Sequence, residues 1–135
     1  MEKQQYGAGI WHFATYVDRY ATDGYGEPRS VLDAIELAGR VRDLSVVDIN
    51  FPYFGGTYTH TDIKSALDKA GLGVIGITPE IYTREFRKGA FTNPDSGIRR
   101  RAHELITESC EAVRFFGASY VKLWPGQDGW DYPFQ

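Results

Sequence analysis

The side chains best suited to chemistry are two carboxylates at or near the ends of predicted strands. Asp48 lies within one apolar run, and Glu80 closely follows another. A carboxylate at such a place could hold a divalent cation or the hydroxyl groups of a ligand. Because each strand carries one acid and neither acid has a cluster around it, we expect a solvated or helix-capping role for both. The sequence lacks the His-Glu-x-x-His, nucleophile-elbow and P-loop patterns, which excludes the enzyme classes built on them.

Aromatic residues are the second chemical feature. The chain has 9 Tyr, 8 Phe and 3 Trp, which together make up 15% of its residues. This content favours a protein that stacks or packs rings, as carbohydrate sites often do. The alternative is that most of these rings fill the core.

Charge and cysteine content narrow the possible partners and the compartment. The net charge is −3 and the sequence has no basic stripe, so we expect neither nucleic acid nor an anionic membrane as a partner. A single cysteine, Cys110, rules out an internal disulfide and suits a reducing compartment. With no hydrophobic leader at the N-terminus, the sequence predicts a soluble, cytoplasmic protein.

Short apolar runs alternate with longer amphipathic stretches along the chain. The runs predict strands over 6–13, 44–51, 72–78 and 119–124, and the stretches predict helices over 30–42, 61–70 and 95–116. Ser30 and Asp33 resemble a capping box, and either Thr61 or Asp62 is expected to cap the second helix. Gly71 and Gly117 are expected to end the second and third helices.

This β-α-β-α-β-α-β order, without hairpin signals, predicts parallel strands joined by right-handed crossovers. Long loops follow the strands and short loops precede them, which places any chemistry at the carboxyl ends of the strands. A complete barrel needs roughly 250 residues. We therefore expect residues 1–135 to be one α/β domain made of the first four βα units, about half, of a parallel (β/α)₈ TIM barrel. Such a chain would be a fragment or a half-barrel that pairs with another chain; a small complete α/β domain is the alternative.

Four motifs, in the same order, resemble those of the xylose isomerase family. Gly9-Ile10-Trp11 resembles the family's Gly-Leu-Trp, and residues 86–95 resemble its Phe-Lys-Asp-Gly-(Gly/Ala)-Phe-Thr-Ser-Asn-Asp loop. Residues 98–102 resemble Val-Arg-Arg-Tyr-Ala, and residues 123–130 resemble Leu-Trp-Gly-Gly-Arg-Glu-Gly-Tyr. Each motif is weak alone, but together they span nearly the whole chain.

The resemblance implies the N-terminal part of a metal-dependent aldose–ketose isomerase, usually a tetramer. We therefore expect a small-molecule sugar as ligand and a homo-oligomeric assembly. Such enzymes use divalent Mg, Mn or Co ions, which polarise the oxygens of the open-chain sugar during hydride transfer. The family's metal-binding carboxylates lie on strands five to eight, so we expect a divalent metal in the longer parent protein and none in this chain.

The resemblance also assigns a sugar-facing wall. Trp11 and Trp124 match tryptophans that line the family's pocket. Phe86 matches its pocket phenylalanine after a one-residue gap, and Thr83 matches a substrate-contacting threonine. Tyr25 resembles a phenylalanine that reaches into the site of a neighbouring subunit.

The chain departs from the family in two places. Gln127 and Asp128 stand where the family has Arg-Glu; we expect both to contact substrate, with a polar turn as the alternative. Asn50 stands where the family has a histidine that helps to open the sugar ring, and an amide cannot act as a general base at neutral pH. His12 is the nearest candidate for that catalytic role, with a structural hydrogen bond as its alternative.

Other functions stay open at this point. Asn50 favours a non-catalytic, sugar-binding half-barrel. A sugar epimerase of the same superfamily would need a pair of acids that the missing half could supply. Apurinic-site nucleases share the fold, but they use a His-rich zinc cluster and a basic face that this sequence lacks.

Overall fold

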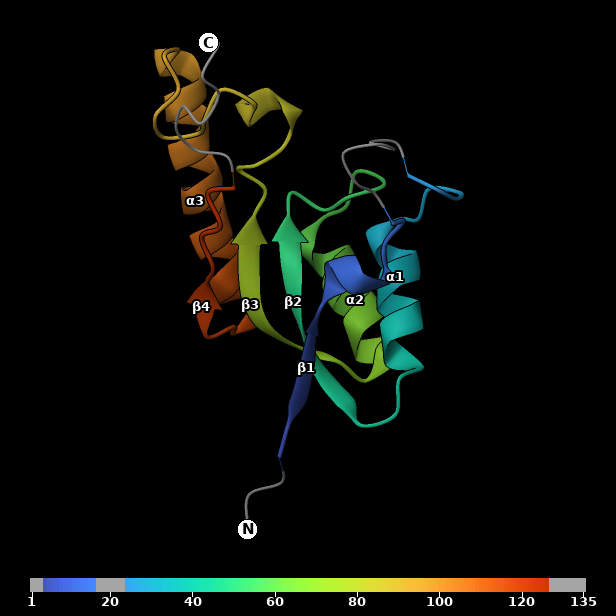
Figure 1. The fold of residues 1–135 in the computed structure, drawn as a ribbon. Coiled ribbons are helices and arrows are strands. Elements are labelled where there is room, and N and C mark those ends of the chain that lie inside the picture. The colour runs from blue at the N-terminus through green and yellow to red at the C-terminus, as the bar shows by residue number, and fades with distance from the viewer. Residues whose placement is uncertain (1–3, 17–23, 127–135) are drawn as a thin grey trace.

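The computed structural model describes residues 4–16 and 24–126, in which strands and helices alternate as the sequence predicts (Figure 1). The elements are β1 Tyr6–Gly9, the 3₁₀ helix η1 Ile10–Phe13, α1 Val31–Gly39, β2 Leu44–Phe51, α2 His60–Ala70, β3 Gly73–Pro79, the 3₁₀ helix η2 Arg84–Phe86, α3 Ser96–Phe116 and β4 Tyr120–Val121.

The strands form one sheet in the order β1-β2-β3-β4, and every neighbouring pair is parallel. Figure 1 shows α1, α2 and α3 on the same side of this sheet. Among the described residues no helix covers the opposite side, which is called the open face below. The predicted α/β class and parallel strands are confirmed, and the arrangement is compatible with half of a TIM barrel. Closure into an eight-stranded barrel stays a prediction.

The first strand is shorter than the predicted run over 6–13. β1 ends at Gly9, and the chain turns directly into η1. The turn buries Ile10 completely in the core, while the neighbouring Trp11 reaches the open face. β1 therefore ends before the predicted run does, because the chain turns at Ile10 to bury that side chain.

The fourth strand is also shorter than predicted, since the run over 119–124 contains only the two residues of β4. Backbone hydrogen bonds to β3 nevertheless continue on both sides of it. The Ser119 and Lys122 amides donate to carbonyl oxygens of β3 over 2.9 Å each. These bonds hold the chain beside β3 as it approaches Trp124.

One apolar cluster joins the helices to the sheet. Alternate residues of β2 and one of β3 contribute Val47, Ile49 and Ile77, which pack against buried residues of α1, α2 and α3. A second, smaller cluster joins the loop after β3 to α3 through Ile81, Phe86, Ala90, Ala102 and Leu105. Burial of these side chains is the main force that fixes the sheet edge relative to the helices. In the part of the chain that is described, no helix is long and apolar enough to cross a bilayer.

The helix ends follow local side-chain chemistry. The predicted capping box of Ser30 and Asp33 is present, and Gly71 and Gly117 adopt the left-handed conformation as expected. The predicted cap of α2 is wrong, because the helix begins at His60. Thr59 is the N-cap, and Asp62 completes a second capping box from the third helical position.

Replacing Thr59 with alanine is expected to lower the free energy of unfolding by about 1 kcal/mol. The change removes the hydroxyl that accepts from the Asp62 amide over 3.2 Å and donates to the Asp62 carboxylate over 2.7 Å. Thr61→Ala is the matched control, since Thr61 is exposed in the first turn of the same helix. Urea unfolding of both variants checks the assignment, and a larger loss in Thr61→Ala would contradict it.

Candidate functional site

The polar residues of β2 lie on the open face. Val47 and Ile49 point to the helices, so Asp48 and Asn50, the alternate residues, point the other way. Asn50 pairs in register with Thr78 of β3, at the carboxyl ends of the two strands. Asp48 is 5% exposed and Asn50 3%, which means that both need hydrogen-bond partners.

Three donors surround the Asp48 carboxylate. The Thr78 hydroxyl donates to Oδ1 over 2.6 Å, and the Tyr120 hydroxyl donates to Oδ2 over 3.1 Å. The Lys122 ammonium lies 3.5 Å from Oδ2. Burial, together with the Asp48 charge, raises the pKa of Tyr120, so this hydroxyl keeps its proton at neutral pH. The expectation that Asp48 is solvated or caps a helix is wrong, because donors from two other strands replace water.

The Trp11 indole lies folded back over β1. A Cβ built on Gly9 would be 2.1 Å from a ring carbon of Trp11, so the ring occupies the space above that glycine. The Lys122 ammonium sits 4.1 Å from the centre of the same ring, a distance at which a cation is attracted to an aromatic face. Trp11 and Lys122 therefore form one connected wall with Asp48 behind it.

A hollow of about 390 Å³ lies at this edge of the sheet, lined by Trp11, Thr78, Tyr82, Lys122 and Trp124. The rings of Tyr82 and Trp124 meet edge to face with their centres 4.9 Å apart. Aromatic pairs prefer this arrangement. The two tryptophans assigned from the sequence thus line the same hollow.

Asn50 does not line the hollow but supports one of the residues that do. Its side-chain amide donates to the Tyr82 hydroxyl over 2.6 Å and so fixes the ring that faces Trp124. Its other amide atom, Oδ1, is buried and has no hydrogen-bond partner among the described residues. Burial, with the nearby Glu80 charge, raises the pKa of Tyr82, which keeps its hydroxyl neutral. Asn50 consequently acts here as a support for Tyr82.

Thr83 and Phe86 lie on a different hollow, of about 190 Å³, which Glu80 and Arg101 also line. Phe86 is only 1% exposed and packs in the second apolar cluster against α3. Glu80 is half-buried between these elements, so the expectation of a solvated or capping role is wrong for it as well. The structure does not bring Thr83 and Phe86 together with the two tryptophans.

His12 and Tyr25 lie on a third hollow, formed by the segments on both sides of residues 17–23. His12 is exposed, and its ring centre is 5.8 Å from that of Trp11. The exposed Tyr25 ring packs against Tyr16 at 5.5 Å. Gln127 and Asp128 lie outside the described residues. The roles assigned to all four stay predictions.

Sequence reasoning missed three residues that line the hollow of about 390 Å³, namely Thr78, Tyr82 and Lys122. Lys122 was within reach of a simple rule, because alternate residues of an extended chain share a face and Lys122 stands two before Trp124. Thr78 is the last residue of the predicted third strand, which is the usual place for a site residue in such folds. Tyr82 carries no comparable signal.

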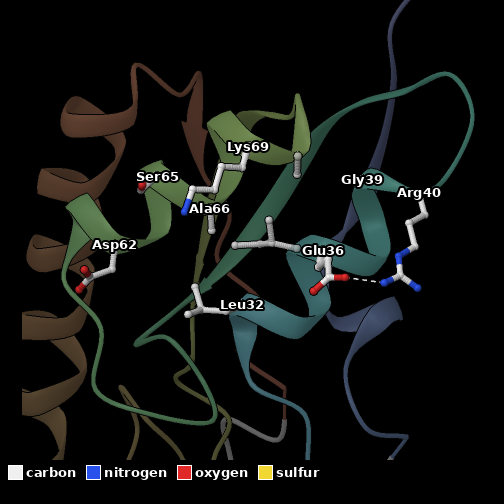
Figure 2. A pocket seen from close by; sticks show the side chains of 10 residues that line it. Leu32, Glu36, Gly39, Arg40, Asp62, Ser65, Ala66 and Lys69 are labelled. Atoms are coloured by element: carbon white, nitrogen blue, oxygen red, sulfur yellow. Dashed lines mark hydrogen bonds and ion pairs between the residues drawn. The ribbon is translucent and has the colours of Figure 1, made fainter.

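Another hollow, of about 570 Å³, lies on the outer side of the molecule between α1 and α2. Figure 2 shows that its side chains come from these two helices and from Arg40, the C-cap of α1, which forms an ion pair with Glu36 on one wall. Asp62, on the other helix, is engaged in the capping box with Thr59. No strand end contributes to this groove, so we place the candidate site on the open face.

The divalent ion implied by the family resemblance finds no ligand set here. Over residues 4–16 and 24–126, no group of three or more His, Cys, Asp or Glu side chains could hold a metal ion. Asp48, whose carboxylate contacts Thr78 and Lys122 of the hollow, already has three donors of its own. The described residues therefore do not fit a metal, and no chemical step is assigned to one.

Comparison with known proteins gives partial similarities. No family model matches the chain. It is 36% identical to the xylose isomerase of Thermus thermophilus over 67 residues, which cover 49% of this chain and 17% of that protein. It is 26% identical to a probable sugar isomerase of Mesorhizobium japonicum over an alignment that covers 100% of this chain and 33% of that protein. The chain thus spans a third or less of these relatives, and it is similar to proteins named as sugar isomerases.

Proposed function

We propose that this chain supplies the sugar-binding aromatic wall of a sugar isomerase. The observation that carries the proposal is the hollow in which Trp11, Tyr82 and Trp124 surround the polar groups of Thr78 and Lys122. Its volume of about 390 Å³ falls in the range of small-ligand sites. The similarity to a xylose isomerase and to a probable sugar isomerase supports the same class of ligand.

The chemistry of the wall suits a monosaccharide. Rings cover the C–H faces of a sugar and exclude water from them, while a hydroxyl and an ammonium group offer hydrogen bonds to its oxygens. In an isomerase of this kind the divalent ion would supply Lewis-acid polarisation of the sugar oxygens. The residues of this chain would bind and orient the sugar and keep water away from it.

Among the described residues that line this hollow, none is a histidine or a carboxylate that could act as the base for ring opening. Asn50 replaces the family's histidine, and its amide holds the Tyr82 hydroxyl. His12, the proposed substitute, lines a neighbouring hollow. These two positions favour a second candidate function, a protein that binds sugars without converting them.

Sugar binding by the chain tests the proposal. D-xylose is titrated against the 135-residue chain by calorimetry, with and without EDTA, and ligand-observed NMR follows the same titration. Trp124→Leu is expected to weaken binding by about 2 kcal/mol, which is the usual cost of removing a central aromatic anchor. Tyr6→Ala is the control, since Tyr6 is an exposed ring at the start of β1, away from the hollow. Absence of binding by the unaltered chain would refute the proposal. Equal binding by Trp124→Leu would show that Trp124 does not contact the sugar.

A further inference from the structure

Lys122 occupies the junction of two hollows on the open face. It lines the hollow of about 390 Å³ and also a second one, of about 450 Å³, over β1, β2 and β3. Its side chain is 41% exposed, although the ammonium contacts Asp48 on one side and the Trp11 ring on the other. The N–H groups of the Lys122 ammonium that face neither Asp48 nor Trp11 are therefore available to a ligand in either hollow.

Asp48 also lines the hollow of about 450 Å³, but its carboxylate oxygens are engaged by donors of the protein. Its Oδ1 accepts from Thr78, its Oδ2 faces both Tyr120 and Lys122, and the side chain is 7% exposed. An ammonium group has three N–H donors, and contact with one carboxylate oxygen leaves others available. Consequently Lys122 would make the contact with a ligand, and Asp48 would set the net charge that the ligand meets.

We infer that Lys122 is a specificity-determining residue of the proposed sugar site, where it donates hydrogen bonds to the hydroxyl groups of a neutral sugar. This inference rests on the proposed function. Since Asp48 balances the charge of Lys122, the pair gives no net attraction to a carboxylate or phosphate group. The site should then prefer neutral sugars to sugar acids and sugar phosphates of the same size.

The test compares D-xylose with D-xylonate, its acid counterpart, on five forms of the chain. The unaltered chain is expected to bind D-xylose at least about tenfold more tightly than D-xylonate. Lys122→Met should lose about tenfold in affinity for D-xylose, the effect of removing a charged hydrogen-bond donor. Asp48→Asn keeps an acceptor oxygen but unmasks the Lys122 charge, so it should bind D-xylonate about tenfold more tightly than the unaltered chain does.

Lys64→Met is the matched control, because Lys64 forms an ion pair with Asp68 on α2, outside both hollows. Lys122→Arg keeps the charge and the donors, and is expected to bind D-xylose within about threefold of the unaltered chain. If Asp48→Asn fails to fold, as circular dichroism would reveal, the pair Lys122→Met and Lys122→Arg still decides the matter.

The outcomes separate the two proposals. If the unaltered chain binds D-xylose and Lys122→Met binds it equally well, the role of Lys122 is refuted while the sugar site stands. Equal losses in Lys122→Met and Lys122→Arg would indicate packing rather than hydrogen bonding and would also refute it. If the unaltered chain binds neither compound, the proposed function fails, and this inference fails with it.

Discussion

Replacing Gly9 with valine is expected to lower the affinity of the chain for D-xylose by about 2 kcal/mol, or roughly thirtyfold. The added Cβ would lie 2.1 Å from one carbon of the Trp11 ring and 2.2 Å from another, so the indole would have to leave its place. The backbone itself accepts valine, since Gly9 has the extended angles φ −72° and ψ 133°. The loss would therefore report on the ring, and calorimetric titration measures it.

Gly26→Ala provides the control for this experiment. A Cβ at Gly26 would meet no atom within 4 Å apart from its two neighbours in the chain, so the substitution should leave both binding and unfolding nearly unchanged. Circular dichroism and urea unfolding establish whether Gly9→Val keeps the fold. Unchanged sugar affinity in a folded Gly9→Val variant would show that the Trp11 indole is not part of the wall.

The order of elements was predictable because hydrophobic periodicity reports which face of each segment is buried. The helices over 30–42, 61–70 and 95–116 correspond to α1, α2 and α3 with small differences at their ends. Periodicity does not report where a strand stops. The apolar run after Gly9 fits a strand as well as a turn, and only the burial of Ile10 under α1 decides between them.

The site was predictable only in part. Because parallel strands end at the same edge of a sheet, Trp11 and Trp124 could be expected on one hollow. The burial of Asp48 could not be expected, since its donors Thr78 and Tyr120 lie 30 and 72 residues away in the chain. The loop after β3 offers several rings, and its sequence does not tell which one faces the sheet and which one packs on α3.

Replacing Glu80 with glutamine is expected to stabilise the chain above neutral pH by about 2–3 kcal/mol. Glu80 follows β3 directly, and its amide donates to the Phe51 carbonyl over 2.8 Å, which holds the residue between the ends of β2 and β3. Burial raises the pKa of its carboxyl group from the ordinary value of 4.5 to about 7. Ionisation of the folded protein is therefore unfavourable, and glutamine removes this cost while it keeps the shape.

The direction of the pH dependence follows from proton binding. Between about pH 4.5 and 7 the unfolded chain has released the Glu80 proton while the folded chain still holds it. The unfolded state then binds fewer protons, so the free energy of unfolding falls as pH rises through this window and levels off above it. Urea unfolding at pH 5 and pH 8 should show this fall for the unaltered chain and a smaller one for Glu80→Gln.

Glu85→Gln is the matched control, because Glu85 lines the same hollow of about 190 Å³ but is exposed in η2. It should follow the pH dependence of the unaltered chain. An equal fall between pH 5 and pH 8 in Glu80→Gln would mean that another group is responsible and that Glu80 ionises near its ordinary pKa.

Because the Glu80 charge contributes to the raised pKa of Tyr82, ionisation of Glu80 also places a negative charge beside the aromatic wall. Measured over the same pH window, D-xylonate affinity should therefore fall more steeply in the unaltered chain than in Glu80→Gln.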